Sequence, residues 1–419
     1  MGIRCRVASI CLVMALLLAS GCASFRPKPA DDAPYLQRAT TAADGGVTLR
    51  VAALTPDEAR DVFGFPMEGD GIQPVWVEVR NSEQLRFFIP PITLDDEYFS
   101  PLEVAWKAHG WFSDDTNARI DRHFWNQRLP VSVDPGATVS GFIFTNLDEG
   151  VKYVSLELIG AGGEQVRHFS VLVPVPGLKA DYQQVDFDSL YKPEETADLD
   201  EDGLRGWLET LTCCTKGGDK QTDGDPLNIA MIGTNQAVFP TLVRRGWHVT
   251  ETTTASSAWQ TIMSSVFGSR YRYAPVSSLY VFGRRQDIAL QKPRGNVDER
   301  NHMRLWRAPV TVKGTPVWVG QISRDIGVRL TRKTITTHKV DPNVDETRWY
   351  LLQDMFFSQG MERFGLVKGV GAATPEAPRT NYTGDPYFTD GLRAVLWMSD
   401  QPITYQRVQV VPWEATPGR

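Results

Sequence analysis

The sequence has few residues of the types that most often bind metals. Five cysteines and six histidines occur among 419 residues, and three of the cysteines lie within the first 22 positions. Beyond them only the adjacent pair Cys213 and Cys214 is left, so a four-cysteine structural zinc site is not expected. The chain also lacks a glycine-rich phosphate loop and a G-x-S-x-G nucleophile elbow, the signatures of two large enzyme classes.

Long apolar runs and dense basic patches are missing as well. Beyond residue 22, no apolar stretch reaches the roughly 20 residues that a transmembrane helix needs. The formal net charge is −6, and without a basic cluster the chain is not expected to bind nucleic acid. A hydrophobic content of 42% permits ordinary globular cores, and the length favours two domains.

The first 21 residues have the organisation of a bacterial signal peptide. Two arginines precede an apolar run of 12 residues, Val7–Leu18, which is too short to span a bilayer. Small residues then lead to Cys22, and this arrangement resembles the lipobox of bacterial lipoproteins. The resemblance implies that Cys22 is lipidated and that, with Ala23 after it, the protein is anchored in the outer membrane and faces the periplasm. The alternative is an ordinary secretory signal cut near Gly21.

A flexible tether and a β-rich domain are predicted next. Residues 22–45 are rich in Pro, Ala and Asp and lack apolar periodicity, which is typical of a linker. Between residues 46 and 177, short alternating or β-branched runs are separated by turn formers such as Asp134-Pro135-Gly136. This spacing predicts an all-β sandwich of immunoglobulin-like type. The segment Ser100-Pro101-Leu102-Glu103 predicts the start of one short helix inside it.

Residues 178–225 are predicted to form an acidic connector. Nine acids and a single lysine occur between Asp181 and Asp202, a density that favours solvation over packing. Cys213 and Cys214 follow in a turn. In an oxidising compartment they can form a vicinal disulfide, and the alternative is a thiol pair in a partly buried turn.

One stretch of this connector matches a calcium-binding pattern. DLDEDGLRGWLE, residues 198–209, fits the D-x-D-x-D-G-x5-E loop of EF-hands. The calcium ligands would be Asp198, Asp200, Asp202 and Glu209. Pro193 disfavours the helix that should enter such a loop, and no second loop exists to pair with it. The alternative is an acidic linker that precedes a helix.

From residue 226 to 410 the pattern changes to α+β. Apolar strands such as LNIAMIG and VWVGQIS alternate with helices predicted over residues 235–246 and 345–360. We therefore expect a mostly antiparallel or mixed sheet with helices packed on it.

Several segments of this half resemble the LssY C-terminal domain family. They occur in the family's order between about residues 225 and 370: GDPLNIAMIG, RRGW, APVSSLYVFGRRQD, NHMRLW, VWVGQISRD and THKVDPNVD. The resemblance implies an LssY-like domain, for which no activity is agreed. The family tends to have paired histidines at two of these places. Here His302 follows Asn301 and His338 precedes Lys339, so each pair is reduced to one histidine.

Polar residues near the predicted strand ends of this domain are candidates for chemistry. The candidate catalytic residues are His302, Asp325, His338 and Asp341, and the candidate ligands of a divalent metal are His302, His338 and Asp345. Arg284, Arg300, Arg304 and Arg324 would make such a cleft attractive to anions. The alternative is structural. Asp341 before a proline makes a turn, Asn343 or Asp345 caps the next helix, and His338 bonds a carboxylate across strands.

Two functions follow from these patterns. The first is a non-catalytic envelope lipoprotein whose C-terminal domain binds a ligand or partner in the periplasm. The second is a metal-dependent hydrolase that acts on a phosphorylated or lipid-derived envelope substrate through a cleft at His302 and His338. The sequence identifies no cofactor, substrate or protein partner. Convergence of His302, Asp325, His338 and Asp341 in an open cleft would favour the enzyme.

Overall fold

The structure is a computed structural model of the chain, and it describes residues 25–29, 33–90, 98–109, 113–163, 165–177, 182, 185–187, 189–250, 276–293, 300–329 and 337–415. For residues 328–329 and 337–338 the description covers the backbone alone. Cys22 lies outside the described residues. The chain divides into two units. The N-terminal unit contains the residues up to 148 together with 154–169, and the C-terminal unit contains 149–153 and the residues from 170 onward.

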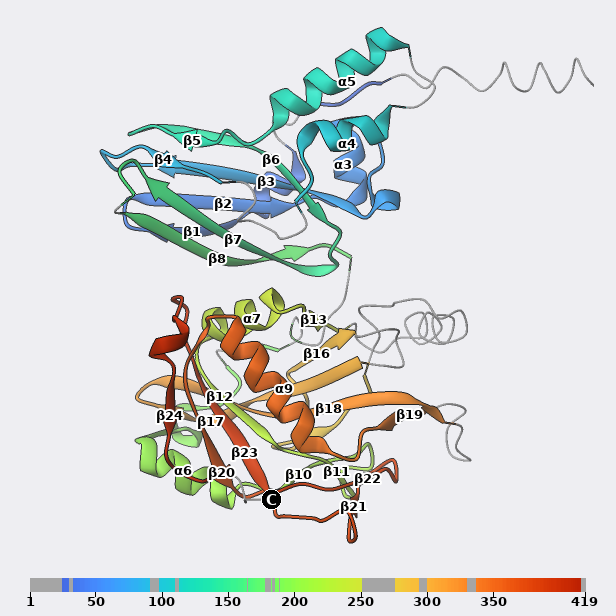
Figure 1. Cartoon of the computed structure of the whole chain (residues 1–419), viewed down its shortest axis with the longest axis vertical. Coiled ribbons are helices and arrows are strands. Elements are labelled where there is room, and N and C mark those ends of the chain that lie inside the picture. The colour runs from blue at the N-terminus through green and yellow to red at the C-terminus, as the bar shows by residue number, and fades with distance from the viewer. Residues whose placement is uncertain are drawn as a thin grey trace, which may run out of the picture. The chain divides into compact units, whose positions relative to one another are not determined.

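Two four-stranded sheets form the framework of the N-terminal unit (Figure 1), although residues 150–153 and 170–175 of the second sheet are grouped with the C-terminal unit. The first is antiparallel, in the order β1 (Thr40–Asp44), β2 (Val47–Ala53), β3 (Ile72–Asn81) and β6 (Thr138–Asn146). The second has the order β5 (Ser132–Val133), β4 (Phe87–Phe88), β7 (Gly150–Gly160) and β8 (Val166–Val175). The sequence of β2 shows why it forms a strand, because Val47, Leu49 and Val51 alternate along one fully buried face.

Helices pack on the first sheet, so the unit is not all-β as predicted. They are α3 (Pro56–Phe63), α4 (Pro101–Ala108) and α5 (Asp114–Gln127), with a short turn η1 (Glu68–Asp70). Their apolar side chains join Trp76, Phe142 and Phe144 of the sheet in one core cluster. Helix α4 begins after Ser100, as predicted, and a capping box between Ser100 and Glu103 fixes its start.

The flexible tether was predicted over residues 22–45, but residues 34–44 of this range form a helix and a strand of the N-terminal unit. Helix α2 (Pro34–Gln37) already belongs to the core, because Tyr35 is fully buried. Strand β1 pairs along its whole length with β2. The alanine-rich segment of β1 has weak strand propensity, and its pairing with the more hydrophobic β2 decides its conformation.

A ten-stranded mixed sheet is the centre of the C-terminal unit (Figure 1). Its order is β13 (His248–Val249), β16 (Ile288–Pro293), β17 (Arg300–Val312), β18 (Thr315–Arg329), β12 (Ile229–Ile232), β23 (Leu392–Met398), β20 (Met361–Lys368) and β24 (Gln409–Val411). Two further strands lie off this path: β9 (Ala197–Leu199) beside β17, and β19 (Thr337–Val340) beside β18. The pairs β12–β23, β20–β24 and β9–β17 are parallel, and the other pairs are antiparallel. The predicted mixed sheet is confirmed.

Apolar clusters cover both faces of this sheet. On one face, α7 (Asn235–Arg244) and α9 (Val344–Phe357) contribute Leu242, Leu351 and Met355 to the larger cluster. On the other face, α6 (Glu201–Thr210) contributes Leu204 and Leu208. The same side carries a small sheet in the order β11 (Asp223–Pro226), β10 (Cys214–Lys216), β14 (Tyr280–Val281) and β15 (Arg284–Arg285). A hairpin of β21 (Arg379–Thr380) and β22 (Pro386–Tyr387) and the short turns η4 (Pro193–Glu195) and η5 (Tyr405–Arg407) complete the unit.

The predicted acidic connector, residues 178–225, belongs to the C-terminal unit where the structure describes it, so the prediction of a separate linker is wrong. Tyr191 donates to the carbonyl of Arg307 at 2.7 Å, β9 pairs with β17, and α6 packs on the sheet through its fully buried leucines. The burial of these leucines outweighs the solvation of the acids around them. Among the described residues, no helix combines the length and the apolar character needed to cross a bilayer.

Candidate functional site

Two of the predicted catalytic residues, His302 and Asp325, meet on neighbouring strands. His302 lies opposite Ser323 in the antiparallel register of β17 and β18, and Asp325 is two residues further on the same face of β18. His302 Nε2 lies 2.7 Å from Ser323 Oγ, and His302 Nδ1 lies 3.4 Å from Asp325 Oδ1. The contacts therefore run from serine to histidine to aspartate, as in the catalytic triad of serine hydrolases.

This group continues into a larger network, which we call the His302 cluster. Its seven side chains come from three adjacent strands and are at most 6% exposed: Gln291, Arg300, His302, Arg304, Gln321, Ser323 and Asp325. Arg300 Nε donates to Asp325 Oδ2 at 3.2 Å and also bonds Gln291. At the other end, Arg304 donates to Gln321 at 2.8 Å, and Gln321 donates to Ser323 Oγ at 2.6 Å.

The burial and the partners of the His302 cluster fit a structural role. Ser323 is fully buried and its hydroxyl already has two partners, so a nucleophile here has no access to a substrate. The guanidinium of Arg300 pairs with the carboxylate of Asp325, which a metal would need as a ligand. The positive charge of Arg300 would repel a metal ion bound beside it. The cluster resembles a buried polar network, in which polar groups satisfy one another away from water.

The other predicted catalytic and metal-binding residues have separate positions. Asp341 makes the predicted turn, because its Oδ1 accepts from the backbone N–H of Asn343 at 3.0 Å. Asn343 caps α9, again as predicted. Asp345 accepts from Thr389 Oγ1 at 2.7 Å and thereby ties the first turn of α9 to the loop before β23. The backbone of His338 lies on β19 next to β18, and its side chain lies outside the described residues.

Burial raises the pKa of Asp345, and the nearby Arg348 opposes this effect. Among the described residues, neither Asp341 nor Asp345 joins His302 in a group of three potential metal ligands. The predicted divalent-metal site therefore has no support from the described residues.

The four arginines predicted to attract anions do not form one cleft. Arg300 and Arg304 belong to the His302 cluster, whereas Arg324 points to the opposite face and donates to Asn301 at 3.0 Å. Arg284 makes two hydrogen bonds of 2.8 Å to the carboxylate of Asp287. Each guanidinium is thus engaged by protein acceptors, which is the physical reason that the prediction fails.

The predicted calcium loop is replaced by a strand and a helix. Asp198 lies in β9 and accepts from Thr311 Oγ1 and from the backbone N–H of Gly314 at 2.7 and 2.8 Å. Asp200 caps α6 through Gly203. Glu209 stands in the last turn of α6, beyond Asp202 in its first turn, and pairs with Arg205 at 3.1 Å. The four carboxylates are therefore not arranged around one ion as an EF-hand requires.

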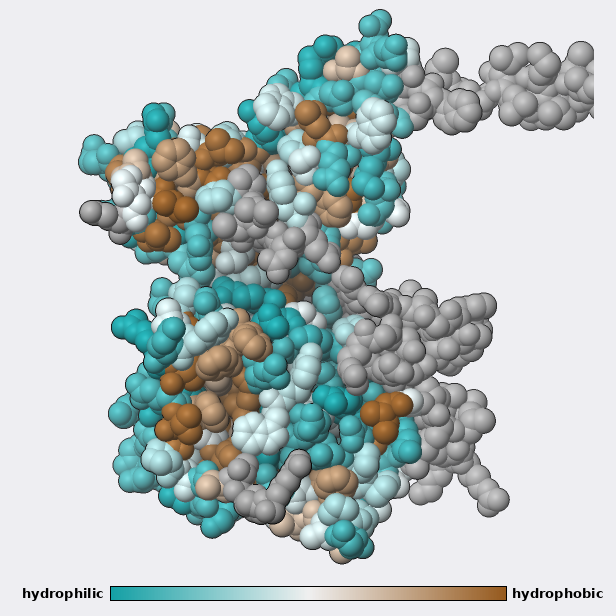
Figure 2. Space-filling view, in the orientation of Figure 1, coloured by the Kyte–Doolittle hydropathy of each residue, from teal (hydrophilic) through white to brown (hydrophobic). Residues whose placement is uncertain are grey.

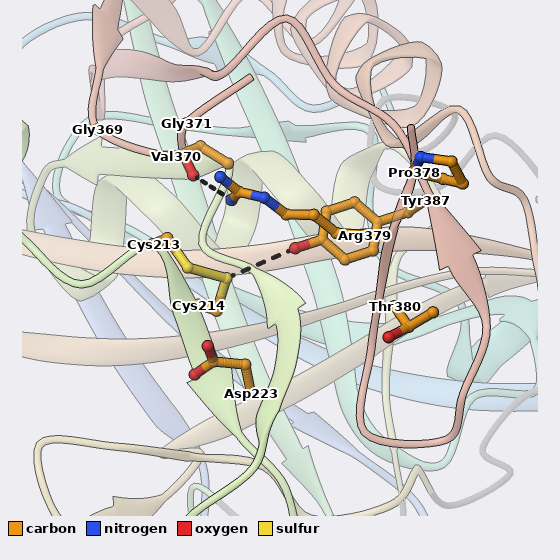
Figure 3. A pocket seen from close by; sticks show the side chains of 10 residues that line it. All are labelled: Cys213, Cys214, Asp223, Gly369, Val370, Gly371, Pro378, Arg379, Thr380 and Tyr387. Carbon is orange, nitrogen blue, oxygen red and sulfur yellow. Dashed lines mark hydrogen bonds between the residues drawn. A yellow bond between two sulfur atoms is a disulfide. The ribbon is translucent and has the colours of Figure 1, made fainter. Parts of the chain in front are cut away.

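A pocket of about 710 Å³ opens beside the adjacent cysteines (Figure 3). Cys213 and Cys214 are joined by a disulfide. The pocket is lined by this disulfide and by residues of β11, the loop after β20 and the β21–β22 hairpin: Asp223, Gly369, Val370, Gly371, Pro378, Arg379, Thr380 and Tyr387. Below we call it the disulfide pocket.

The polar groups of the disulfide pocket are held in definite positions. The hydroxyl of Tyr387 donates to Cys214 Sγ at 3.6 Å, and Arg379 Nη1 donates to the carbonyl of Val370 at 3.0 Å. Gly371 lies beside the guanidinium of Arg379 and has φ +79°, a left-handed conformation that favours glycine. Burial raises the pKa of Tyr387, and the neighbouring Arg379 lowers it by less.

Sequence reasoning identified the cysteines of this pocket but missed Arg379 and Tyr387. These two residues follow the cysteines by more than 160 positions and have no motif of their own. The Gly-Val-Gly run at 369–371 was the one local signal, because glycines often mark a close approach of the backbone.

Residues 209–392 match the model of a protein family described as the LssY C-terminus. This match confirms the predicted resemblance and contains both the His302 cluster and the disulfide pocket, although Asp198 and α6 up to residue 208 lie before it. A comparison with curated proteins gave no match to the chain.

Proposed function

Because residues 209–392 carry an LssY C-terminal domain, we propose that this chain is a lipid-anchored envelope protein whose C-terminal unit binds a small ligand without transforming it. The ligand site is the disulfide pocket. The anchor is Cys22, and the bound ligand is presented to the periplasm from the outer membrane. The N-terminal unit acts as an immunoglobulin-like spacer between the anchor and the ligand-binding unit.

The observation that carries the proposal is the contrast in solvent access between two groups of polar residues. The His302 cluster is sealed, and most of its hydrogen bonds run between its own members. The disulfide pocket is open, and its volume lies within the usual range for small-molecule sites, about 300–1,000 Å³. Its lining combines apolar surface, from the disulfide, Val370 and Pro378, with the positioned polar groups of Arg379 and Tyr387.

Support for the anchor comes from the first 22 residues. The short apolar run and the small residues before Cys22 have the lipobox pattern, and several acyl chains give durable attachment. The spacer is supported by the two four-stranded sheets of the N-terminal unit, since two sheets are the minimum that an immunoglobulin-like sandwich requires.

Fluorine NMR of the mature chain tests the pocket. The probes are 4-fluorobenzyl alcohol, 4-fluorobenzoate and 4-fluorobenzylamine, which share one ring and differ in charge. We expect at least one probe to show relaxation broadening that Thr380→Trp abolishes, because the indole fills the pocket from its exposed rim. Thr404→Trp is the matched control, an exposed threonine at the start of η5 without a capping hydrogen bond. No binding of any probe, or equal loss in both variants, would refute the pocket as the binding site.

Cell fractionation tests the anchor. Cys22→Ser should move the protein from the membrane fraction to the soluble periplasmic fraction, because no acyl chain can then be attached. Ser20→Ala, which keeps a small residue in the same pattern, serves as the control and should stay with the membrane. Salt-resistant membrane association of the Cys22→Ser protein would show that lipid is not the main tether.

A further inference from the structure

We infer that the disulfide pocket selects small organic anions, a carboxylate or phosphate carried on an apolar body, with Arg379 as the residue that holds the negative charge. The inference rests on the proposed function, because it names the ligand class of the same pocket. It is derived from the charges that remain available at the pocket, the apolar character of one wall and the position of the tyrosine hydroxyl.

The charge available at the pocket is that of Arg379. The other charged lining residue, Asp223, pairs with Lys216 at 2.6 Å, which offsets part of its negative charge. Among the described residues, no carboxylate forms an ion pair with Arg379, whose hydrogen bonds go to neutral partners, the carbonyl of Val370 and the hydroxyl of Tyr387. Arg379 is exposed to solvent, and a guanidinium with donors left over can bind a carboxylate or phosphate with two parallel hydrogen bonds.

The wall facing the guanidinium is apolar. Figure 3 shows the Cys213–Cys214 disulfide, Val370 and the ring of Tyr387 grouped around the side chain of Arg379. A disulfide has no hydrogen to donate, and its sulfurs form only weak hydrogen bonds, so this surface suits the hydrocarbon part of a ligand. A hydrated inorganic ion would gain nothing from such a wall, whereas an aromatic or aliphatic acid buries its body against it.

Tyr387 sharpens the choice between anions and cations. Its side chain is almost fully buried at 4% exposure, and burial raises the pKa of its phenol, so the hydroxyl is neutral at physiological pH. A neutral phenol offers no negative charge to a cationic ligand. The guanidinium of Arg379 is also held by its hydrogen bond to the backbone carbonyl of Val370 at 3.0 Å. The cation is therefore held in place before a ligand arrives, which reduces the ordering cost of binding.

The fluorine probes compare the affinities of ligands that share one ring and differ in charge. For the mature wild-type chain, 4-fluorobenzoate and 4-fluorophenyl phosphate should bind at least tenfold more tightly than 4-fluorobenzyl alcohol, and 4-fluorobenzylamine should bind least. Arg379→Gln should reduce the affinity for the two anions about tenfold or more and leave that for the alcohol unchanged, since a hydrogen bond to a charged group is lost. Arg407→Gln, an exposed arginine of η5, is the matched control and should change none of these affinities.

Two results would overturn the inference. One is equal affinity for the alcohol and the two anions in the wild-type chain, and the other is unchanged anion binding in Arg379→Gln. In both, the neutral probe still binds in the pocket, so the proposed function would stand while the ligand class fails. If no probe binds at all, the proposed function itself fails. The ratio of benzoate to phenyl phosphate affinity assigns the anion, because a dianionic phosphate gains more than a carboxylate from the same arginine.

Discussion

The His302 cluster and the disulfide pocket make an instructive pair within one domain. Both gather chemically capable side chains from separate strands, and both contain an arginine and an aspartate. In the cluster the two charges face each other in a sealed space, Arg300 against Asp325. In the pocket they are apart, and the arginine is open to solvent. Residue types alone thus indicate that a group of side chains could bind or react. Whether it can reach a ligand depends on its solvent access and on the hydrogen bonds and ion pairs that it already makes within the protein.

The largest expected effect is a difference in stability between variants of two aspartates, Asp325 of the cluster and Asp223 of the pocket. Asp325→Ala should lower the free energy of unfolding of the C-terminal unit by about 3–5 kcal/mol, because it leaves a buried guanidinium without its carboxylate. Asp223→Ala removes one partner of an exposed ion pair and should cost no more than about 1 kcal/mol. Urea unfolding followed by tryptophan fluorescence measures both. Similar losses in the two variants would contradict the distinction between a sealed and an open site.

A smaller effect is expected from the histidine. His302→Ala should cost about 1–3 kcal/mol, because Ser323 and Asp325 lose a buried partner, and it should not change any response to metal. Thermal melts of wild type and variant, each with EDTA and with added zinc, measure this. Zinc-dependent stabilisation of the wild type that disappears in His302→Ala would instead support the metal-dependent hydrolase.

The smallest effect concerns the tyrosine of the pocket. Because burial raises the pKa of Tyr387, the unfolded chain ionises first, so stability is retained below about pH 10. It should then fall as the pH rises from the ordinary tyrosine value to the folded pKa. Tyr387→Phe should lack this part of the alkaline loss of stability. Arg379 lowers the same pKa, so Arg379→Gln should shift the ultraviolet titration of Tyr387 to higher pH. An unchanged titration of Tyr387 would show that the two side chains do not interact.

Local patterns predicted the fold where one element is specified by its own residues. The start of α4 at Ser100 and the cap of α9 at Asn343 were predictable, because capping uses neighbouring side chains. The mixed sheet followed from alternating apolar strands. The place of β1 and α6 was not predictable, since it depends on pairing with β2 and on burial against a distant sheet.

The candidate site shows the same limit. Of the four candidate catalytic residues near strand ends, His302 and Asp325 do meet, because they lie on the hairpin of β17 and β18. That the pair would be sealed was not visible, since burial depends on the whole domain. Arg379 and Tyr387 were missed because the chain returns to the cysteines only after the whole sheet has formed.

The alternation of residues along β17 and β18 also has a consequence for how the sheet folds. Arg300, His302 and Arg304 point to one face, while Met303 and Leu305 point to the other and enter the larger apolar cluster. If the hairpin paired one residue out of register, the two arginines would be forced into hydrocarbon and the apolar pair would face Asp325. Such a misaligned hairpin would pay the desolvation of several charges at once. The His302 cluster therefore favours the native register of β17 and β18 over one shifted by a single residue.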